Sequence, residues 1–406
     1  MRVNFMKKIY NLLIIILGFV FITLLIGCSE DPEPSLYNLV TPAGASPTIT
    51  SITSSTSTPL AGFSTLTING SNFSQNVNEN FVFFNGIKGT VISATATKID
   101  VKSPASVFGD SIKVRVTVHK NENISNTFIY AIQNPINIPF PFDPKVGDIP
   151  WAVTAFNNGD LLVSLDGKGI KKISSRVMSD YIPKGAESYW NTIKLTSNGD
   201  VYGARNLRGV WKMLQNTPPA VAPWAITPTG TRVWDFDWDQ NFNVWAVGNN
   251  NVIIKVKPDL TSSTYNFVGN LRTVRYFNGY LYVAGARDNL EKVWRFVVDS
   301  NGNLGAEEEY FNLSARNPAV TINTMTISAD GFLYLGTNKK KDPIIEIKPD
   351  RTASDFYPGV VPATDVLSFY WPQGQFLYFV RKADTNMDQT IIRLNMLKNG
   401  APNYGN

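Results

Sequence analysis

The sequence contains a single cysteine, Cys28, and a single histidine, His119. One cysteine excludes an internal disulfide, and one histidine excludes a metal site built from several histidines. A Ser-His-Asp triad or a histidine general base would depend on His119 alone. Charged residues make up only 17% of the chain, whereas hydrophobic residues make up 43%. A chain of 406 residues with this balance can bury a sizeable core, and its length suggests two or three domains of roughly 150 residues.

The first 27 residues have the parts of a secretory signal. Three basic residues come first: Arg2, Lys7 and Lys8. An apolar run follows over residues 12–26. The sequence Leu-Ile-Gly-Cys at 25–28 resembles the bacterial lipobox, which implies that residues 1–27 are a signal peptide and that Cys28 is lipidated. The alternative is a transmembrane anchor with an incidental cysteine, but the run is short for a spanning helix, which needs ~20 residues.

The segment after Cys28 is acidic and rich in proline and serine. Residues 29–33 read Ser-Glu-Asp-Pro-Glu, which resembles the export signal of surface-exposed lipoproteins in Bacteroidota. The alternative is an acidic, solvated tether without a signalling role. We expect residues 28–46 to be the lipidated cysteine and a flexible tether. The resemblance implies a protein that is anchored by lipid to the outer membrane and faces the cell exterior.

Processing at this site would change the charge balance. The full chain has 37 basic and 32 acidic residues, a net charge of +5. Loss of the three signal-peptide basic residues leaves 34, so the mature net charge is +2. A nucleic-acid-binding surface needs a clustered excess of lysine and arginine. We therefore expect no nucleic-acid partner, and contact with the membrane only through the lipid.

Residues 47–132 contain no tryptophan and alternate between short apolar runs and turns. Period-two runs such as 112–118, and the Asn85-Gly86 turn, predict antiparallel strands. Roughly seven strands in this length predict a small β-sandwich. Three patterns stand out: Pro47-x-Ile49-x-x-Ile52, Leu66-x-Ile68-x-Gly70-x-Asn72-Phe73 and Val82-x-Phe84-Asn85-Gly86. They resemble the IPT/TIG domain, an immunoglobulin-like module that commonly serves as a spacer. His119 then falls at a strand end, where we expect no chemical role.

Within residues 133–406, which we expect to form one NHL-like domain, residues 149–396 repeat one pattern six times: an apolar strand, a turn, a second strand and a third. The turns lie 40, 42, 38, 52 and 43 residues apart, at Gly159, Gly199, Asn241, Gly279, Gly331 and Gly374. A period of ~40 residues with about four strands is typical of a propeller blade. The glycine turns and the Lys-Pro-Asp segments at 257–259 and 348–350 resemble NHL-type repeats. The predicted fold is therefore all-β, an Ig-like β-sandwich followed by a six-bladed β-propeller.

The last blade lacks an outer strand, because little chain follows its third strand. Residues 135–141, from the N-terminal side of the propeller, could add this strand and close the ring. Several prolines in this segment suit only an edge strand.

Three tryptophans lie at or beside the start of the innermost strand of their blades. These are Trp151, Trp190 and Trp234, and the corresponding residues of the other blades are Arg272, Asn323 and Leu367. The loops after the second strands reach the same face and carry Arg205 and Arg287, among other polar residues. Aromatic rings can stack on the C–H faces of sugars while polar groups bond the hydroxyls. We predict a ligand site formed by Trp151, Trp190, Trp234, Arg272, Asn323, Arg205 and Arg287. The alternative is that the tryptophans plug the channel or pack between blades.

Asp235, Asp237 and Asp239 alternate along one segment. Oxygen-rich clusters suit Ca²⁺, but this one lacks the glycine and the distal glutamate of an EF-hand loop. Period-two spacing would also spread the carboxylates along a strand, so a solvated strand face is favoured. We predict neither a metal nor a cofactor.

The order of these parts resembles the surface glycan-binding lipoproteins of Bacteroidota. This resemblance implies non-catalytic binding of a polysaccharide or oligosaccharide, beside an outer-membrane transporter and its substrate-capturing lipoprotein. One alternative is a carbohydrate hydrolase or lyase on the propeller, which would need facing carboxylates or a Tyr/Arg cluster in one pocket. Another is a protein-interaction scaffold, which would present an exposed patch without a cleft.

Overall fold

The computed structural model describes residues 44–405, except 120, 122, 216, 217, 249 and 363. The expected signal peptide (1–27), Cys28 and most of the expected tether (28–46) lie outside the described residues. Within the described part, no helix is long and apolar enough to cross a membrane. The described chain is almost entirely β-structure, which confirms the predicted fold class.

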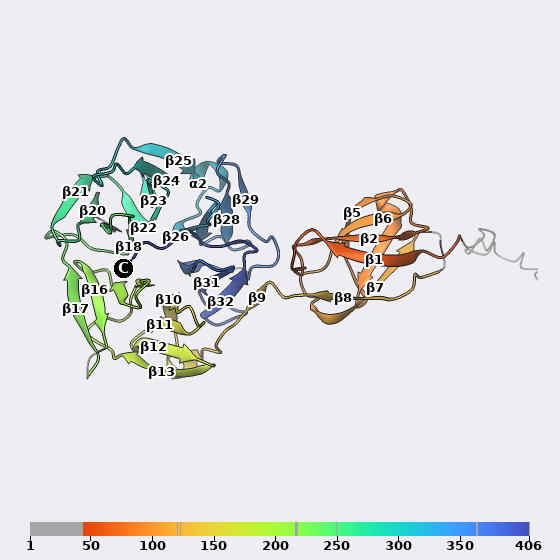
Figure 1. The fold of residues 1–406 in the computed structure, drawn as a ribbon, viewed down its shortest axis with the longest axis horizontal. Coiled ribbons are helices and arrows are strands. Elements are labelled where there is room, and N and C mark those ends of the chain that lie inside the picture. The colour runs from red at the N-terminus through yellow and green to blue at the C-terminus, as the bar shows by residue number, and fades with distance from the viewer. Residues whose placement is uncertain are drawn as a thin grey trace, which may run out of the picture.

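The N-terminal domain is a sandwich of two four-stranded antiparallel sheets (Figure 1). One sheet has the order β1 (Thr48–Ser54), β2 (Thr65–Ser71), β6 (Lys98–Lys102) and β5 (Thr90–Ala94). The other has the order β4 (Ile87–Lys88), β3 (Asn80–Phe84), β7 (Gly109–Val118) and β8 (Phe128–Ile132), with the 3-10 helix η1 (Val77–Glu79) before β3. Alternate residues point inward, so that the core holds Ile68, Val82, Phe84, Val101 and Val114.

The Asn85-Gly86 turn forms as predicted and joins β3 to β4. Both residues have positive φ, 48° and 87°, as a tight hairpin turn of this kind requires. His119 directly follows β7 and is exposed.

In the described part of the chain, the C-terminal domain is a ring of six four-stranded sheets (Figure 1). In each sheet the first strand is innermost. The first three blades are β10 (Pro150–Ala155), β11 (Leu161–Leu165), β12 (Gly169–Ser174), β13 (Val177–Ile182); β14 (Thr192–Leu195), β15 (Val201–Ala204), β16 (Val210–Leu214), β17 (Ala220–Ala225); and β18 (Asp235–Trp238), β19 (Val244–Val247), β20 (Val252–Val256), β21 (Ser262–Asn266).

The next two blades are β22 (Asn270–Phe277), β23 (Tyr280–Arg287), β24 (Leu290–Val297), β25 (Glu308–Asn312); and β26 (Ile322–Ile327), β27 (Leu333–Thr337), β28 (Ile344–Ile347), β29 (Ala353–Asp355). The short helix α2 (Leu313–Arg316) follows β25. The sixth blade is β30 (Val366–Tyr370), β31 (Phe376–Arg381), β32 (Thr390–Asn395) and β9 (Ile136–Asn137), and the 3-10 helix η2 (Pro144–Val146) follows β9.

Burial follows the position of each strand in its blade. The second strands β11, β15, β19 and β27 are buried along their whole length, because the neighbouring blades cover both of their faces. The outer strands β13 and β21 are mostly exposed. This gradient explains why the second strands are composed mainly of apolar and small residues.

The ring is closed by chain from the N-terminal side, as predicted. β9 pairs antiparallel with β32, through Asn137 opposite Arg393 and Ile136 opposite Leu394. The paired strand has only two residues, whereas residues 135–141 were expected to contribute. Prolines at 139 and 141 lack the N–H group that a longer ladder needs.

The two domains touch through a small apolar contact. Leu60 of the sandwich is 1% exposed and packs in the same cluster as Tyr357 and Val361 of the propeller. The rings of Phe63 and Tyr357 have centroids 4.1 Å apart. Leu60 also forms a backbone bridge to Gln133, where the chain passes to the propeller.

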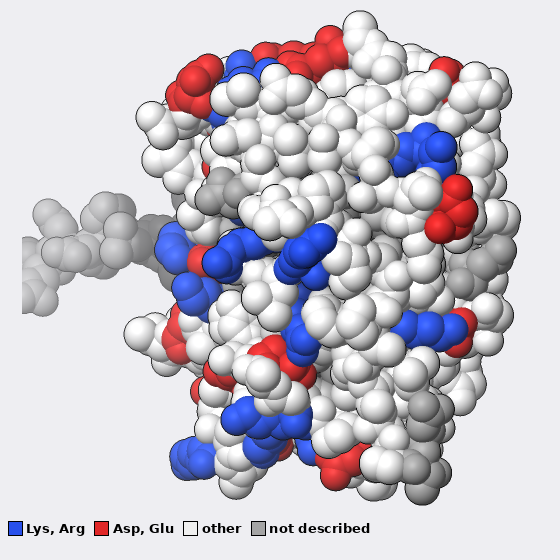
Figure 2. All heavy atoms as spheres, turned by 90° about the vertical axis from the view of Figure 1, so that its left-hand side faces the viewer, with Lys and Arg blue, Asp and Glu red and all other residues white. Residues whose placement is uncertain are grey.

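Charges of both signs are mixed on the surface. On the side of the molecule drawn in Figure 2, basic and acidic side chains lie among one another on a mostly uncharged surface. Many are paired across neighbouring strands, as Lys292 is with Glu309 at 2.7 Å and Arg295 with Glu308 at 2.6 Å.

Candidate functional site

The innermost strands of the six blades surround a cavity on the propeller axis. Its volume is about 250 Å³, and every innermost strand contributes to its wall. Four of the predicted site residues line it: Trp151, Trp234, Arg272 and Asn323. All four lie at the start of an innermost strand, so the repeat position identified in the sequence corresponds to one end of the cavity, which we call the mouth.

Aromatic rings form part of the mouth. Trp151 stacks on Tyr189, with centroids 4.0 Å apart and an interplanar angle of 8°. Trp234 is fixed by its indole N–H, which donates to Asn206 Oδ1 at 2.5 Å. Trp151, Tyr189 and Trp234 are all partly exposed. The mouth therefore presents flat apolar surfaces that are already held in place.

Polar side chains complete the mouth. Arg272 Nε donates to the carbonyl of Ile322 at 2.5 Å, and its guanidinium is paired with Glu291. Glu291 also accepts a bond from the Ile322 amide at 3.1 Å. Asn323 donates through Nδ2 to the carbonyl of Val366 at 3.0 Å. These bonds tie neighbouring blades together and fix both side chains.

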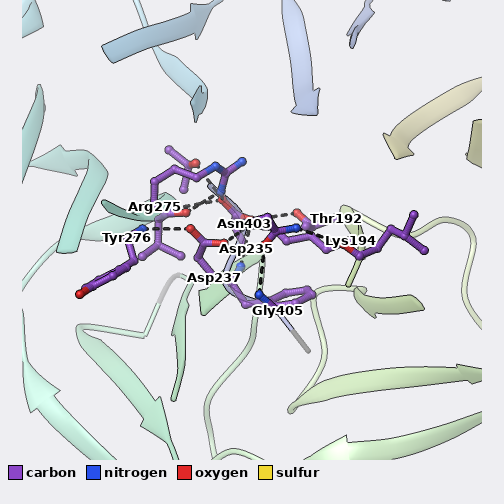
Figure 3. Close-up of polar contacts among 12 residues, drawn as sticks. Thr192, Lys194, Asp235, Asp237, Arg275, Tyr276, Asn403 and Gly405 are labelled. Atoms are coloured by element: carbon purple, nitrogen blue, oxygen red, sulfur yellow. Dashed lines mark hydrogen bonds and ion pairs between the residues drawn. The ribbon is translucent and has the colours of Figure 1, made fainter. Parts of the chain in front are cut away.

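Two ion pairs lie deeper in the cavity (Figure 3). Lys194 Nζ lies 2.8 Å from Asp237, and Arg275 Nη1 lies 2.7 Å from Asp235. Asp235 also accepts bonds from the Thr273 hydroxyl at 2.8 Å and from the Val274 amide at 3.1 Å. The carboxylates on β18 thus join it to β14 on one side and to β22 on the other.

The buried position of these groups affects their protonation. Burial alone would raise the pKa of Asp235, but the charges of Arg275 and Lys194 and the bond from Thr273 outweigh it, so the pKa lies below its usual value. Burial, followed by repulsion from Arg275, lowers the pKa of Lys194 despite the attraction of Asp237. Asp235 therefore stays ionised at neutral pH.

The C-terminal segment crosses the opposite end of the cavity. The Ala401 amide donates to the carbonyl of Ile327 at 3.0 Å, and Asn403 Nδ2 donates to the carbonyl of Leu195 at 3.0 Å. Both acceptors are the last residues of innermost strands. Figure 1 shows the C-terminus in the centre of the ring. The cavity is thus a funnel, open at the mouth and floored by the C-terminal segment; we call it the funnel below.

Trp190 does not line the funnel, and this part of the prediction is corrected. Its side chain is fully buried and packs in the cluster of Leu162, Ile193 and Met213 between the first two blades. The equivalent position at the mouth is taken by Asn191, which lines the funnel. A ligand cannot reach Trp190 in this arrangement.

Arg205 and Arg287 hold the loops together and do not line the funnel. Arg205 is paired with Glu187 and lies over the ring of Trp211, with 4.1 Å between its guanidinium carbon and the ring centroid. Arg287 lies over Phe267 at the same distance and is bonded to Glu307 through two nitrogen–oxygen contacts, one of 2.9 Å. Arg205 does border a second, shallower depression beside the mouth, with a volume of about 290 Å³.

The three alternating aspartates have separate partners and do not converge. Asp235 and Asp237 face the funnel, whereas Asp239 is fully buried and accepts bonds from Asn243 and from the Trp245 indole N–H at 2.9 Å. Within the described residues, no three His, Cys, Asp or Glu side chains are grouped so as to hold a metal ion. The favoured interpretation, a solvated strand face, is wrong, because Asp235 and Asp239 are buried and Asp237 is only 13% exposed, each with its own hydrogen-bond or ion-pair partners.

Several funnel residues were not identified as site residues from the sequence, among them Tyr189, Lys194 and Arg275. Tyr189 lies in a loop outside the strand repeat. Lys194 and Arg275 occupy strand positions that would usually be exposed or apolar. The only sequence signal for these two cations was the group of aspartates on the neighbouring strand β18. Aspartates that are buried need positively charged partners.

Comparisons with known proteins support the architecture. Residues 47–130 match the IPT/TIG domain family, which confirms the predicted N-terminal module. No curated protein matches the sequence of the chain. Several solved structures share its fold at low sequence identity.

One is an auxiliary nutrient binding protein from Bacteroides thetaiotaomicron VPI-5482, with 9% identity and a TM-score of 0.51 over 87% of this chain and 98% of the other. A candidate phosphatase from the same organism has 11% identity and a TM-score of 0.56 over 87% and 99%. A luciferin-regenerating enzyme has 12% identity and a TM-score of 0.50 over 63% of this chain and 94% of the other. At these identities the likeness concerns the fold alone, and the match to the luciferin-regenerating enzyme covers only part of it.

Proposed function

We propose that the protein binds a neutral oligosaccharide or the accessible part of a polysaccharide in the funnel, without cleaving it. The observation that carries this proposal is the stacked pair of Trp151 and Tyr189 beside Trp234, at the mouth of a cavity with polar walls. Sugar rings have apolar C–H faces and polar edges, and such a ligand matches rigid aromatic surfaces surrounded by hydrogen-bonding groups.

The charges in the funnel favour an uncharged ligand. The cations that line the described funnel are Lys194, Arg272 and Arg275, and each is paired with a carboxylate. A charged sugar would have to compete with these buried or partly buried pairs, and breaking such a pair is costly.

Binding is favoured over hydrolysis by the state of the carboxylates. A glycosidase needs one carboxyl group that is protonated near neutral pH to act as the acid. Asp235 has a lowered pKa and is bonded to Arg275, and Asp237 is bonded to Lys194. The funnel also distinguishes the protein from a flat interaction scaffold, because its concave site is already formed. The B. thetaiotaomicron auxiliary nutrient binding protein of the same fold is consistent with this role.

The test is titration calorimetry of residues 29–406 against neutral polysaccharides, each supplied intact and as a partial hydrolysate. Trp151→Ala and Trp234→Ala should weaken binding of the active sample about tenfold or more, as expected for aromatic residues at the centre of a site. Trp224→Ala is the matched control. Trp224 is also partly exposed, but it lies on the outer strand β17, where it packs on Tyr202.

Binding that survives both mouth substitutions would contradict the site. Release of new reducing ends during incubation would favour the hydrolase alternative, and absence of binding to every sample would favour a scaffold.

We also propose that the mature protein is anchored by lipid at Cys28 and displayed on the outer membrane, where it would pass its ligand to a transporter and that transporter's substrate-capturing lipoprotein. The support is the lipobox at 25–28 and the acidic residues after it. Wild-type protein should incorporate labelled palmitate and be cut by protease added to intact cells, and Cys28→Ala should lose the label. Chemical crosslinking in cells should recover the two partners, and their absence would contradict the proposed transfer.

A further inference from the structure

The floor of the funnel is held by several independent contacts. Besides the backbone and side-chain bonds of Ala401 and Asn403, the ring of Tyr404 packs edge-on against Tyr276, with centroids 5.2 Å apart. The Ser197 amide donates to the carbonyl of Gly405 at 3.2 Å. Together with the bridge between Ser328 and Gly400, these contacts reach three different blades. The floor is therefore a fixed part of the propeller.

A cavity closed at one end restricts how a polymer can enter it. A chain that passed through the propeller would need openings at both ends of the axis. The cavity volume of about 250 Å³ is slightly below the usual range for pockets that hold drug-sized ligands, ~300–1,000 Å³. Such a space suits a short terminal piece of a glycan and not a folded-back segment from its middle.

A path for the rest of the glycan lies beside the mouth. Tyr189 and Asn191 line both the funnel and the second depression, which also contains Ser188, Asn206 and Leu207. A chain whose end is in the funnel could therefore leave across Tyr189, where the ring offers a flat surface, and lie in this depression.

We infer that the funnel receives the end of a glycan chain and that the following units leave over Tyr189. This inference rests on the proposed glycan-binding function and specifies which part of the ligand is recognised. It implies that affinity depends on the number of chain ends, because internal units cannot reach Lys194, Ser368 and the other residues below the mouth.

The test is a length series. Linear hexasaccharides of α-1,4-glucan, β-1,3-glucan, β-1,4-mannan and β-1,4-xylan are titrated into residues 29–406, beside longer unbranched fractions of the same polymers. For the polymer that binds, chains ten times longer have one tenth as many ends per gram. When concentration is expressed by mass, such a fraction should therefore bind about tenfold more weakly than the hexasaccharide. The affinity per chain should stay constant.

A substitution inside the funnel tests the same point. Ser368 lines the funnel, and its hydroxyl makes no hydrogen bond within the described structure. Ser368→Trp would fill the space without removing a bond and should abolish binding of the hexasaccharide. Tyr189→Ala should weaken the hexasaccharide more than the disaccharide of the same series, which would not reach the depression.

The outcomes separate the inference from the proposed function. Equal affinity by mass for short and long chains would overturn end recognition but leave glycan binding intact. A folded Ser368→Trp variant that still binds the hexasaccharide would also overturn it. If that variant does not fold, the length series on the unaltered protein decides alone. If no saccharide of any length binds, the proposed function fails and the inference fails with it.

Discussion

The ion pair between Asp235 and Arg275 gives the most quantitative prediction. The side chains of Asp235 and Arg275 are only 5% and 13% exposed, and the carboxylate also accepts bonds from Thr273 and Val274. Asp235→Ala would leave a buried guanidinium without its counter-charge and remove the acceptor of several donors. Breaking a buried pair from one side costs about 3–5 kcal/mol of unfolding free energy. For a domain of this size that corresponds to a fall in Tm of about 10 °C.

The effect should depend on pH. A carboxyl group whose pKa is lower in the folded than in the unfolded state stabilises the fold above its unfolded pKa, which is about 3.9. That contribution is lost as the pH falls through the folded pKa. Because the pKa of Asp235 is lowered, the Tm difference between wild type and Asp235→Ala should be full at pH 7 and should shrink below about pH 4.

Thermal unfolding followed by circular dichroism at pH 7 and pH 3 measures both effects. Asp180→Ala is the control, because Asp180 also pairs with a cation, Lys171, but its side chain is 76% exposed. An exposed pair contributes little, so this variant should unfold close to wild type. If Asp235→Ala lost no more stability than Asp180→Ala, the view that this pair joins the blades would be refuted.

Three further predictions concern other parts of the molecule. Trp190→Ala should lower the unfolding free energy by about 3–5 kcal/mol, as for other buried tryptophans, but should not remove saccharide binding at temperatures where the variant is folded. Binding should change little between low and high salt in calorimetry, because the cations in the funnel are already paired; a steep salt dependence would indicate a charged ligand. Phe63→Ala should cost roughly 1–2 kcal/mol and separate the unfolding of the two domains in scanning calorimetry, because the ring packs on Tyr357 across their contact.

The fold could be predicted from sequence because its signals are repeated or local. Six turns at a spacing of about 40 residues each support the same architecture, so the prediction of a propeller does not depend on any single repeat. The Asn85-Gly86 turn fixes a hairpin through backbone geometry that few other residues adopt. The length of β9 was overestimated because pairing depends on which N–H groups face β32, a matter of register that composition does not reveal.

The mouth was partly predictable, and the case of Trp190 shows the limit. Asn191 and Trp234 are equivalent in the repeat, since each donates its amide to the second strand of its blade just before the innermost strand begins. Trp190 precedes Asn191 by one residue. Side chains alternate between two faces along an extended chain, so a shift of one residue turns a ring from the funnel into the core between blades. Whether a residue lines the funnel therefore depends more on its register along the strand than on its being aromatic.

The interior of the funnel could not be predicted, because it depends on contacts between blades. Lys194, Asp237 and Tyr276 lie on the innermost strands of three consecutive blades and meet only where these blades pack side by side. Their spacing along the sequence, about one blade apart, carries no signal that distinguishes partners from surface residues. These charged groups must pair because they are buried, and their burial depends on the packing of neighbouring blades.

The way in which the ring closes explains why the funnel has a floor. In the sixth blade the outer strand is β9, which comes from before the propeller and not from the C-terminus. The chain after β32 is therefore not needed for the sheet and can turn inward across the axis, where residues 401–405 meet the ends of the innermost strands. If the C-terminal segment instead formed the outer strand, the axis would stay open at that end. Closure of the ring by N-terminal residues and recognition of a chain end are thus two consequences of one topology.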